Sequence, residues 1–497
     1  KIVLNMGIGE AKEDAKIFGT EKPNVRSVYP MTPDAYAELI HSSKVKIIET
    51  QEYFTDYTHR KIIAKVRRAE REIHSVIDKN SFLSIAEKEQ FISLFHVLAS
   101  SSYYILFSIK YLGPWLIYNG AKWVKTSDLA KAYQILSEYI FTQHHPTYFN
   151  IVINTNDKHS KLVNHINNFT FSILNKFNCI WTTGTEYGLR DLNKLILEAD
   201  SNTVIFYLRS AASKAKLIRS IKNLFFAINP YKKFKEFGII PITSSVIPTN
   251  TEKIFKAISD KNLKLIIPII RNYINKSLRY IQSIDSYTNE IFIKSNPKIL
   301  ISHQLKFSES LVLGVVAKKN NIHSILISHG SHPMPQNITA GYELFANARN
   351  MIFSDLSSES VVQSPSAENY LKEFLPNTNF RKSKPIMWGR KNININYRKR
   401  DRKLVLHAGT SKALGTRPWI YETPSEYVKG LQQLLRAFNE MNDVTLVIRA
   451  RASTECSLKT LKKLLPRSKN YIIKTGGNFF NDLAKADLLI SFSSTTI

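Results

Sequence analysis

Residues 298–302 read KILIS and residues 324–328 read SILIS, and each of these runs leads directly into a histidine. Both runs are apolar at consecutive positions, a pattern typical of a strand that is buried on both faces. Strands of this kind occur in parallel sheets that helices cover on both sides. These two stretches therefore predict an α/β protein built on parallel sheets.

Similar runs recur along the chain and alternate with longer helical patterns, which favours a doubly wound α/β architecture. We expect strands at Lys1–Met6, Val45–Glu49, Asn150–Asn154, Thr203–Leu208, Ile239–Thr243, Lys298–Ser302, Ser324–Ser328, Asn350–Ser354, Lys403–His407, Val444–Arg449 and Asp487–Phe492. Residues 58–143 show helical patterning alone and predict a helical insertion. Within them, the aromatic-rich residues 101–124 are interrupted by Lys110 and Gly113-Pro114. We expect two buried helical segments there, with an interfacial membrane contact as the alternative.

A polar stretch rich in Asn and Arg lies between Met387 and Lys403 and marks the clearest domain boundary. We expect an amino-terminal Rossmann-like domain over residues 1–390, a linker over 391–402 and a carboxyl-terminal Rossmann-like domain over 403–497. Ligands of such domains usually bind in a cleft at the carboxyl ends of the strands. The chain stops after a strand and a Ser/Thr turn that ordinarily open a helix, so the second domain is expected to be truncated.

The composition of the 497 residues limits the class of protein. A hydrophobic content of 43% excludes a disordered chain. The two cysteines, Cys179 and Cys456, exclude a disulfide framework and a Cys-rich metal site, and they indicate a reducing, cytoplasmic compartment. The formal charge of +29 has three interpretations: a solvated basic surface, attraction to phosphates on nucleotides or lipids, and nucleic-acid binding. Nucleic acid ranks last, because no zinc-finger spacing or RNA-recognition signature is present.

Three expected strands in the carboxyl-terminal region end in turns with the chemistry of an anion site. The residues in question are Gly409, Thr410 and Ser411 after the first strand, Arg449 and Arg451 at and after the end of the second, and Ser493, Ser494 and Thr495 after the third. In a parallel sheet these turns lie at one edge, where small residues, guanidinium groups and hydroxyls bind phosphate. A plain helix cap and surface salt bridges are the alternative interpretations.

Histidines follow two strands of the first domain. His303 follows residues 298–302, and His329 follows residues 324–328 and precedes Gly330. A histidine at the carboxyl end of a buried strand faces the expected cleft, and its imidazole titrates near neutrality. His329, and after it His303, are therefore candidate general bases, with a hydrogen-bonded turn histidine as the alternative.

Two short motifs resemble those of glycosyltransferases of the GT-B fold that build bacterial surface polysaccharides, such as capsule or lipopolysaccharide. The run LLISFSSTTI at residues 488–497 resembles the turn that contacts donor phosphate. The run ILISHGSHP at residues 325–333 resembles a strand–His–Gly element whose histidine is implicated as base. Residues 28–35 resemble an early segment of surface carbohydrate biosynthesis proteins. Residues 1–16 alone resemble a ribosomal protein segment, a match judged coincidental or artefactual.

This resemblance implies a metal-independent enzyme that moves a sugar from a nucleotide-activated donor to a surface-polysaccharide or lipid-linked glycan acceptor. It implies Ser493 and Ser494 as donor-binding residues and His329 as the base, with the nucleotide sugar as substrate and no further cofactor. A peripheral contact with the anionic inner face of the membrane is also expected, and no nucleic acid. Related enzymes often carry a His-Pro pair where this chain has Arg449-Ala450-Arg451, so the nucleotide base stays open. The alternatives are a nucleotide-sugar epimerase of the same fold and a non-catalytic basic protein that binds membranes or polyanions.

Overall fold

The computed structural model describes residues 26–30, 36–37, 39–40, 45–47, 55–79, 83–111, 115–118, 122–125, 159–183, 189–209, 216–229, 235–246, 249–306, 308–328, 338–384, 401–409, 424–450, 458–465, 470–477 and 479–492. The chain divides into two compact units. The central unit comprises Ile63–Ala99 and Phe141–Arg390, and the carboxyl-terminal unit comprises Lys1–Ile62, Ser100–Ile140 and Lys391–Ile497. The domain boundaries expected from the sequence stay a prediction.

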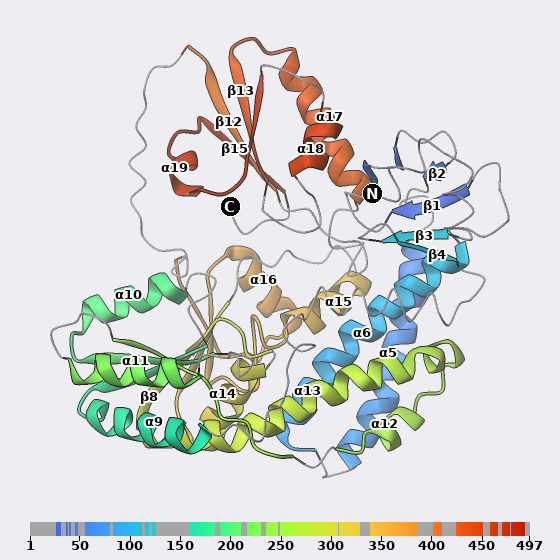
Figure 1. The fold of residues 1–497 in the computed structure, drawn as a ribbon. Helices are drawn as coiled ribbons and strands as arrows, with labels where there is room; N and C mark the ends of the chain where they lie inside the picture. The colour runs from blue at the N-terminus through green and yellow to red at the C-terminus, as the bar shows by residue number, and fades with distance from the viewer. Residues whose placement is uncertain are drawn as a thin grey trace. The chain divides into compact units, whose positions relative to one another are not determined.

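A seven-stranded sheet with parallel pairing throughout is the framework of the central unit (Figure 1). Its strands are β5 (Asn178–Thr182), β6 (Thr203–Leu208), β7 (Glu236–Ile239), β8 (Pro297–Ser302), β9 (Ser324–Ile327), β10 (Glu359–Val362) and β11 (Phe380–Lys382). All six residues of β6 are buried, as a strand covered on both faces requires. The predicted parallel, helix-covered sheet is confirmed.

Helices connect these strands or pack around them (Figure 1). They are α5 (Asp56–Lys79), α6 (Ile85–Tyr111), α9 (Ser160–Leu174), α10 (Leu189–Ala199), α11 (Lys216–Ile228), α12 (Glu252–Lys256), α13 (Lys261–Lys294), α14 (Ser308–Lys319), α15 (Ile338–Ala348) and α16 (Pro365–Phe374). Capping residues fix where two of these helices begin. Asp260 accepts hydrogen bonds from the first turn of α13, and Ser364 caps α16, which has a proline in its first turn.

The strand order defines where the direction of winding reverses. The order is β11-β10-β9-β8-β5-β6-β7. The chain runs outward from β5 to β7, returns through the 34-residue helix α13 to β8, and then runs outward the other way. The reversal, or switch point, therefore lies between β5 and β8. In doubly wound sheets, ligands bind outside the carboxyl ends of the strands at this point.

An aromatic cluster holds the middle of the central sheet. Trp181 of β5 is fully buried and packs against Phe206 of β6 and Phe292 of α13, with ring centroids 5.6 and 5.5 Å away. The indole N–H of Trp181 donates a 2.7 Å hydrogen bond to Ser295 Oγ, so this polar group is satisfied inside the core. The cluster fixes β5 against the helix that delivers the chain to β8.

The carboxyl-terminal unit contains a second parallel sheet with the order β14-β13-β12-β15. Its elements are β12 (Lys403–Gly409), α17 (Pro424–Asn439), β13 (Val444–Ala450), α18 (Leu458–Leu464), β14 (Tyr471–Lys474), α19 (Phe479–Leu483) and β15 (Leu488–Phe492). The apolar sides of α17 and α18 pack on this sheet around Leu435, Leu446 and Leu461. The winding reverses between β12 and β15, as it does between β5 and β8 in the central unit. The chain is thus an α/β protein with two Rossmann-like units.

A small four-stranded sheet also belongs to this unit. Its order is β2-β1-β3-β4, from β1 (Arg26–Pro30), β2 (Val45–Ile47), β3 (Trp115–Tyr118) and β4 (Lys122–Lys125). Helices α5 and α6 occupy most of the described part of the stretch expected to be helical, but β3 and β4 form an antiparallel hairpin inside it. The expectation of helix is therefore wrong for these eight residues. The missed signal is Asn119-Gly120, a hairpin turn pair between two β-favouring runs.

The strand expected at Asn350–Ser354 is also wrong. The segment follows α15 as a turn, and its pairing is limited to an isolated bridge between Arg349 and Phe353. Asn350 has a φ of 62°, in the left-handed region that asparagine tolerates, and its side-chain oxygen accepts a hydrogen bond from Ser354. This local bond competes with strand formation. The expected strand at Ile239–Thr243 is displaced, because β7 ends at Ile239.

Candidate active site

The switch point of the central sheet brings two polar residues together. The carboxyl ends of β5 and β8 are in register, with Thr182 opposite Ile301. One residue further on, Thr183 Oγ1 lies 3.1 Å from His303 Nδ1 and accepts a 3.3 Å hydrogen bond from the His303 backbone N–H. Because the Thr183 hydroxyl accepts a hydrogen bond from the backbone, its own hydrogen is available to donate to Nδ1 of His303. This arrangement favours the tautomer of His303 that carries its proton on Nε2.

The structure therefore places His303 at the edge where a ligand of this fold is expected. Its ring is 3% exposed. Thr183 was not expected from the sequence, because 120 residues separate it from His303 and the strand that carries it was not predicted. The candidate base His329 lies outside the described residues. Strand β9, which leads to it, pairs in parallel with β8, which leads to His303.

Two buried polar atoms near the ends of β8 and β9 lack partners. The Oγ of Ser328, directly after β9, and the Nε2 of Gln90, on α6, have no hydrogen-bond partner among the residues that the structure describes. Gln90 Oε1 accepts a 3.3 Å bond from the backbone N–H of Ser308, where α14 begins. Buried polar groups are ordinarily paired. Two unpaired groups at the carboxyl end of the central strands are consistent with a polar ligand.

A buried lysine adds positive charge to this region. Lys306, four residues after β8, is 3% exposed, and its Nζ donates to the backbone oxygen of Ala346 on α15 at 3.1 Å. Lysine is seldom buried so completely. Lys306 was not among the predicted site residues. A charged residue three positions after His303, close to the end of a buried strand, is nevertheless a sequence feature that indicates a functional site.

Helix α15 follows the segment that contains His329, and polar contacts anchor it to α5 and α6. Tyr342 donates to Glu70, whose Oε1 lies 2.6 Å from His96 Nδ1. Burial alone raises the pKa of Glu70, but the charge and hydrogen bond of His96 and the bond from Tyr342 outweigh it and bring this pKa below its usual value. Arg349, just after α15, pairs with Glu89 at 2.6 Å. These contacts fix α15 against α5 and α6.

The three expected anion-binding turns of the carboxyl-terminal unit do start at one edge. Gly409, the last residue of β12, is opposite both Ala450 of β13 and Phe492 of β15. The predicted common edge is thus confirmed, and its centre is the switch point between β12 and β15. Thr410, Ser411, Arg451, Ser493, Ser494 and Thr495 lie outside the described residues, so their roles stay predictions.

Arg449 is held in place by neighbours in its own unit. Its Nη1 pairs with Asp482, and its Nη2 donates to the Gly477 carbonyl at 2.5 Å. The guanidinium lies 5.5 Å from the ring centroid of Phe479, a cation–π contact. Gly477, whose carbonyl Arg449 binds, has a φ of 77°, a backbone conformation that glycine adopts more readily than other residues.

The charges around Asp482 leave this edge positive. Asp482 is 7% exposed and binds both Arg449 and Lys474, so two cations share one carboxylate. The net charge of the cluster is positive, which favours an anion nearby. Arg449 therefore forms a salt bridge, as the alternative interpretation of this residue expects. The same salt bridge holds its guanidinium in a fixed position beside the predicted phosphate site.

His407 lies beneath the same edge and is uncharged at neutral pH. It is 3% exposed on β12, and burial lowers its pKa from 6.5 to about 4. A neutral histidine two residues before Gly409 leaves the positive charge of this edge to Arg449 and Lys474.

The low pKa of His407 predicts a loss of stability in mild acid. In the unfolded chain this ring takes up a proton below about pH 6.5, but in the folded chain only below about pH 4. The free energy of unfolding therefore falls by about 2 kcal/mol from this group between about pH 7.5 and about pH 5. Urea unfolding at both values checks this, with His407→Gln as the comparison. A decline of equal size in the variant would contradict it.

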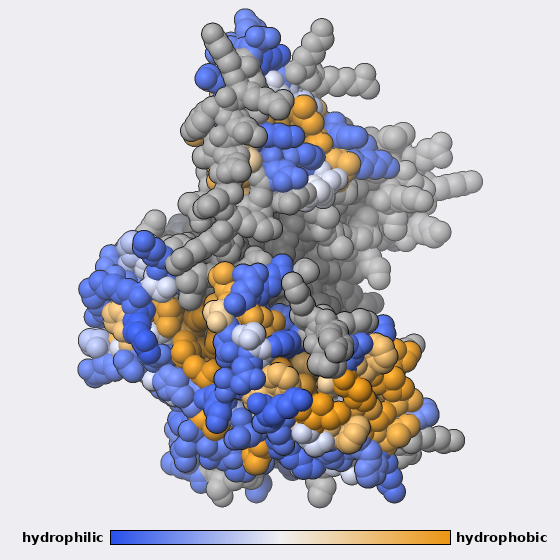
Figure 2. All heavy atoms as spheres, turned by 90° about the vertical axis from the view of Figure 1, so that its left-hand side faces the viewer, coloured by the Kyte–Doolittle hydropathy of each residue, from blue (hydrophilic) through white to orange (hydrophobic). Residues whose placement is uncertain are grey.

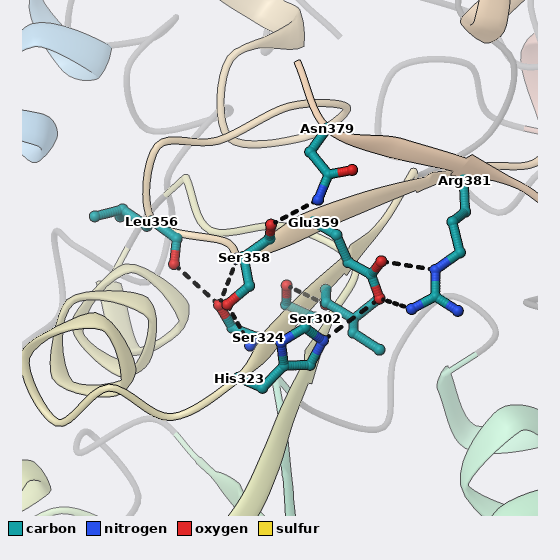
Figure 3. A network of polar contacts seen from close by, with 9 residues as sticks. Ser302, His323, Ser324, Leu356, Ser358, Glu359, Asn379 and Arg381 are labelled. Carbon is teal, nitrogen blue, oxygen red and sulfur yellow. Dashed lines mark hydrogen bonds and ion pairs between the residues drawn. The ribbon is translucent and has the colours of Figure 1, made fainter. Parts of the chain in front are cut away.

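A third polar cluster lies at the opposite, amino-terminal edge of the central sheet (Figure 3). Arg381 donates to both carboxylate oxygens of Glu359, at 2.7 and 2.6 Å, and holds the pKa of Glu359 below its usual value. His323 approaches the same carboxylate at 3.5 Å. A cavity of about 480 Å³ opens beside this cluster, between residues 353–360 and 374–379. The cavity lies where β10 and β11 begin, whereas His303 follows the end of β8.

Comparison with protein-family models and with curated proteins gives no match. Solved structures of similar fold include MurG of Acinetobacter baumannii (TM-score 0.31, 11% identity, 64% of this chain and 72% of MurG). They also include the spinosyn rhamnosyltransferase SpnG complexed with thymidine diphosphate (0.31, 12%, 63% and 75%) and apo UGT2 of Phytolacca americana (0.36, 11%, 63% and 76%). At these identities and TM-scores, no conclusion about this chain rests on the likenesses.

Two further observations concern the described residues. Among the helices in the described part of the chain, none is both long enough and apolar enough to cross a bilayer. A search of the same residues for three or more His, Cys, Asp or Glu side chains arranged to hold a metal ion finds no such group.

Proposed function

We propose that this chain is a glycosyltransferase that moves a sugar from a nucleotide-activated donor to a glycan or lipid-linked acceptor of a surface polysaccharide. The observation that carries the proposal is the common edge of β12, β13 and β15. There a glycine turn, an arginine fixed by Asp482 and a predicted hydroxyl turn start side by side at a switch point. This is where an α/β sheet binds a nucleotide, and these groups are ones that bind phosphate.

The donor diphosphate binds this edge of the carboxyl-terminal unit. Ser493, Ser494 and Thr495 donate hydroxyl hydrogen bonds, and the turn of Gly409, Thr410 and Ser411 contributes backbone N–H groups. Arg449 and Arg451 supply positive charge. As the bond between the sugar and the diphosphate breaks, charge grows on the leaving phosphate, and these fixed donors and cations stabilise it. Metal independence is part of the proposal, because the same groups provide the charge that a metal ion otherwise supplies.

The acceptor binds the switch-point edge of the central unit. His329 takes the proton of the acceptor hydroxyl while the oxygen of that hydroxyl forms a bond to the anomeric carbon of the sugar. His303, held by Thr183, donates a hydrogen bond to the acceptor through Nε2. Among the described residues, the Ser328 hydroxyl and Gln90 Nε2 have no hydrogen-bond partner, which supports a polar guest at this edge.

The donor site is tested by nucleotide binding. We expect the double variant Ser493→Ala/Ser494→Ala to bind a nucleoside diphosphate about 10- to 100-fold more weakly than the parent, because each lost hydrogen bond to a charged group weakens binding by about tenfold. Calorimetric titration measures the change. Ser357→Ala/Ser358→Ala, in the central unit, is the matched control and keeps the parental affinity. Equal affinity in both variants would exclude the proposed donor site.

A further inference from the structure

Helix α11 exposes a row of apolar side chains, although its Phe226 and Ala227 pack against the core as in an ordinary surface helix. Ile218, Ile221, Phe225 and Ile228 are 60, 50, 57 and 57% exposed, and their spacing places them along one stripe. On the inward side, the buried residues are Ser220 and Asn223. Asn223 Nδ2 donates a 3.0 Å hydrogen bond to the Gly238 carbonyl next to it in β7. This bond ties the inward side of α11 to β7, so the apolar stripe is on the outward side.

Helix α9 packs beside α11 and extends the apolar area. Its Phe169 and Leu162 are 55 and 48% exposed, while Val163, Phe171 and Leu174 face the core. We call these six exposed side chains the α9–α11 surface: Leu162, Phe169, Ile218, Ile221, Phe225 and Ile228. Figure 2, which turns the side that carries α9 and α11 toward the viewer, shows hydrophobic residues gathered on this side of the central unit. Single exposed apolar residues are ordinary, but six on two adjacent helices mark an interaction site.

The charged residues of the two helices themselves have one sign. Neither α9 nor α11 contains an Asp or Glu, and the two helices carry Lys161, Lys216, Arg219 and Lys222, with Lys176 just after α9. An acidic residue near α9 is Glu290 of α13. It pairs at 2.6 Å with Lys294, whose Nζ also reaches Asn168 of α9 at 3.2 Å. The apolar side chains are thus flanked by cations, and the neighbouring acid is neutralised.

We propose that the α9–α11 surface docks on an anionic lipid bilayer, with its apolar side chains among the acyl chains and its lysines and arginine at the headgroups. Apolar residues flanked by Lys and Arg are the composition of helices that lie in the membrane interface. A second copy of this chain fits less well, because pairing two such surfaces brings two basic rims together. The proposal does not depend on the proposed transferase activity. It differs from the membrane contact considered for residues 101–124, where Ser102 and Tyr103 are buried.

Vesicle flotation of the full chain tests this proposal. We expect flotation with vesicles in which about a third of the lipid is phosphatidylglycerol, and little with pure phosphatidylcholine. Ile221→Ser/Phe225→Ser is expected to lower partitioning by about 30-fold or more, because two of the four inserted apolar side chains of α11 are lost. Arg219→Gln/Lys222→Gln is expected to lower it by about 10- to 30-fold, and added salt acts in the same direction.

The control variant carries the same kind of change at another place. Ile85 and Ile472 are 58 and 55% exposed on other elements, so Ile85→Ser/Ile472→Ser keeps parental flotation. Circular dichroism checks that each variant is folded. Equal flotation with both kinds of vesicle, or parental flotation of Ile221→Ser/Phe225→Ser, would overturn the proposal. So would a dimer, seen by sedimentation, that this variant abolishes in a chain that does not float.

Discussion

Replacing His329 by alanine is expected to lower the turnover of sugar transfer by about 10²- to 10⁴-fold. A positioned general base contributes a factor of this size by taking the acceptor proton in the transition state. The affinity for the donor nucleotide is expected to stay unchanged, because the donor binds the carboxyl-terminal unit. Nucleotide release in the presence of acceptor measures turnover, and calorimetric titration measures donor affinity.

His323 provides the matched control for this variant. It precedes β9 at the amino-terminal end, whereas His329 follows the same strand at the carboxyl end. His323→Gln therefore removes an imidazole next to the same strand, and its turnover is expected to stay within about twofold of the parent. If His329→Ala kept turnover within a similar range, a different residue would have to be the base. A loss of both turnover and donor affinity would instead indicate a structural role.

Replacing Asp482 by alanine is expected to destabilise the carboxyl-terminal unit by about 3–5 kcal/mol. The carboxylate is 7% exposed and binds Arg449, whose side chain is 14% exposed, as well as Lys474. Its removal leaves the mostly buried guanidinium without its counter-charge, and such a loss costs more than the intact pair contributes. Urea unfolding followed by circular dichroism measures the change.

Two further variants separate the loss of the salt bridge from a general loss of charge. Glu440→Ala removes an exposed carboxylate after α17 and is expected to change stability by about 0.5 kcal/mol or less. Arg449→Met/Asp482→Leu removes the pair together and is expected to be more stable than Asp482→Ala, because no buried charge is left unpaired. A loss below about 1 kcal/mol for Asp482→Ala would show that water screens the contact as at an open surface.

Much of the sheet framework could be predicted from the sequence, because buried parallel strands have a local signature. The expected strand at Thr203–Leu208 matches β6 at both ends, and those at Lys298–Ser302 and Lys403–His407 lie within β8 and β12. The central strand β5 was missed. It begins with the polar or small residues Asn178-Cys179, and its burial comes from packing on β6 and α13.

The candidate site was predictable where it depends on strand ends and not where it depends on strand order. The local apolar pattern predicts that His303 follows a strand. Parallel pairing of the strands predicts that the three turns share one edge of the sheet. The partner Thr183 follows from the adjacency of β5 and β8, which the long return through α13 creates. The bond between Arg449 and Asp482 likewise depends on where α19 lies. Such contacts join residues distant in sequence, so no local period encodes them.

The central claim is that the carboxyl-terminal edge of β12 and β15 binds the diphosphate of a nucleotide sugar. Its most direct test is a thermal-shift titration of the chain with uridine, cytidine, guanosine and thymidine diphosphates. A ligand that binds the folded state raises the melting temperature by mass action, and at about 100 times its Kd it contributes about 2.7 kcal/mol. We predict a saturable rise with one base over the others, which Ser493→Ala/Ser494→Ala reduces. No rise with any of the four nucleotides would contradict the account.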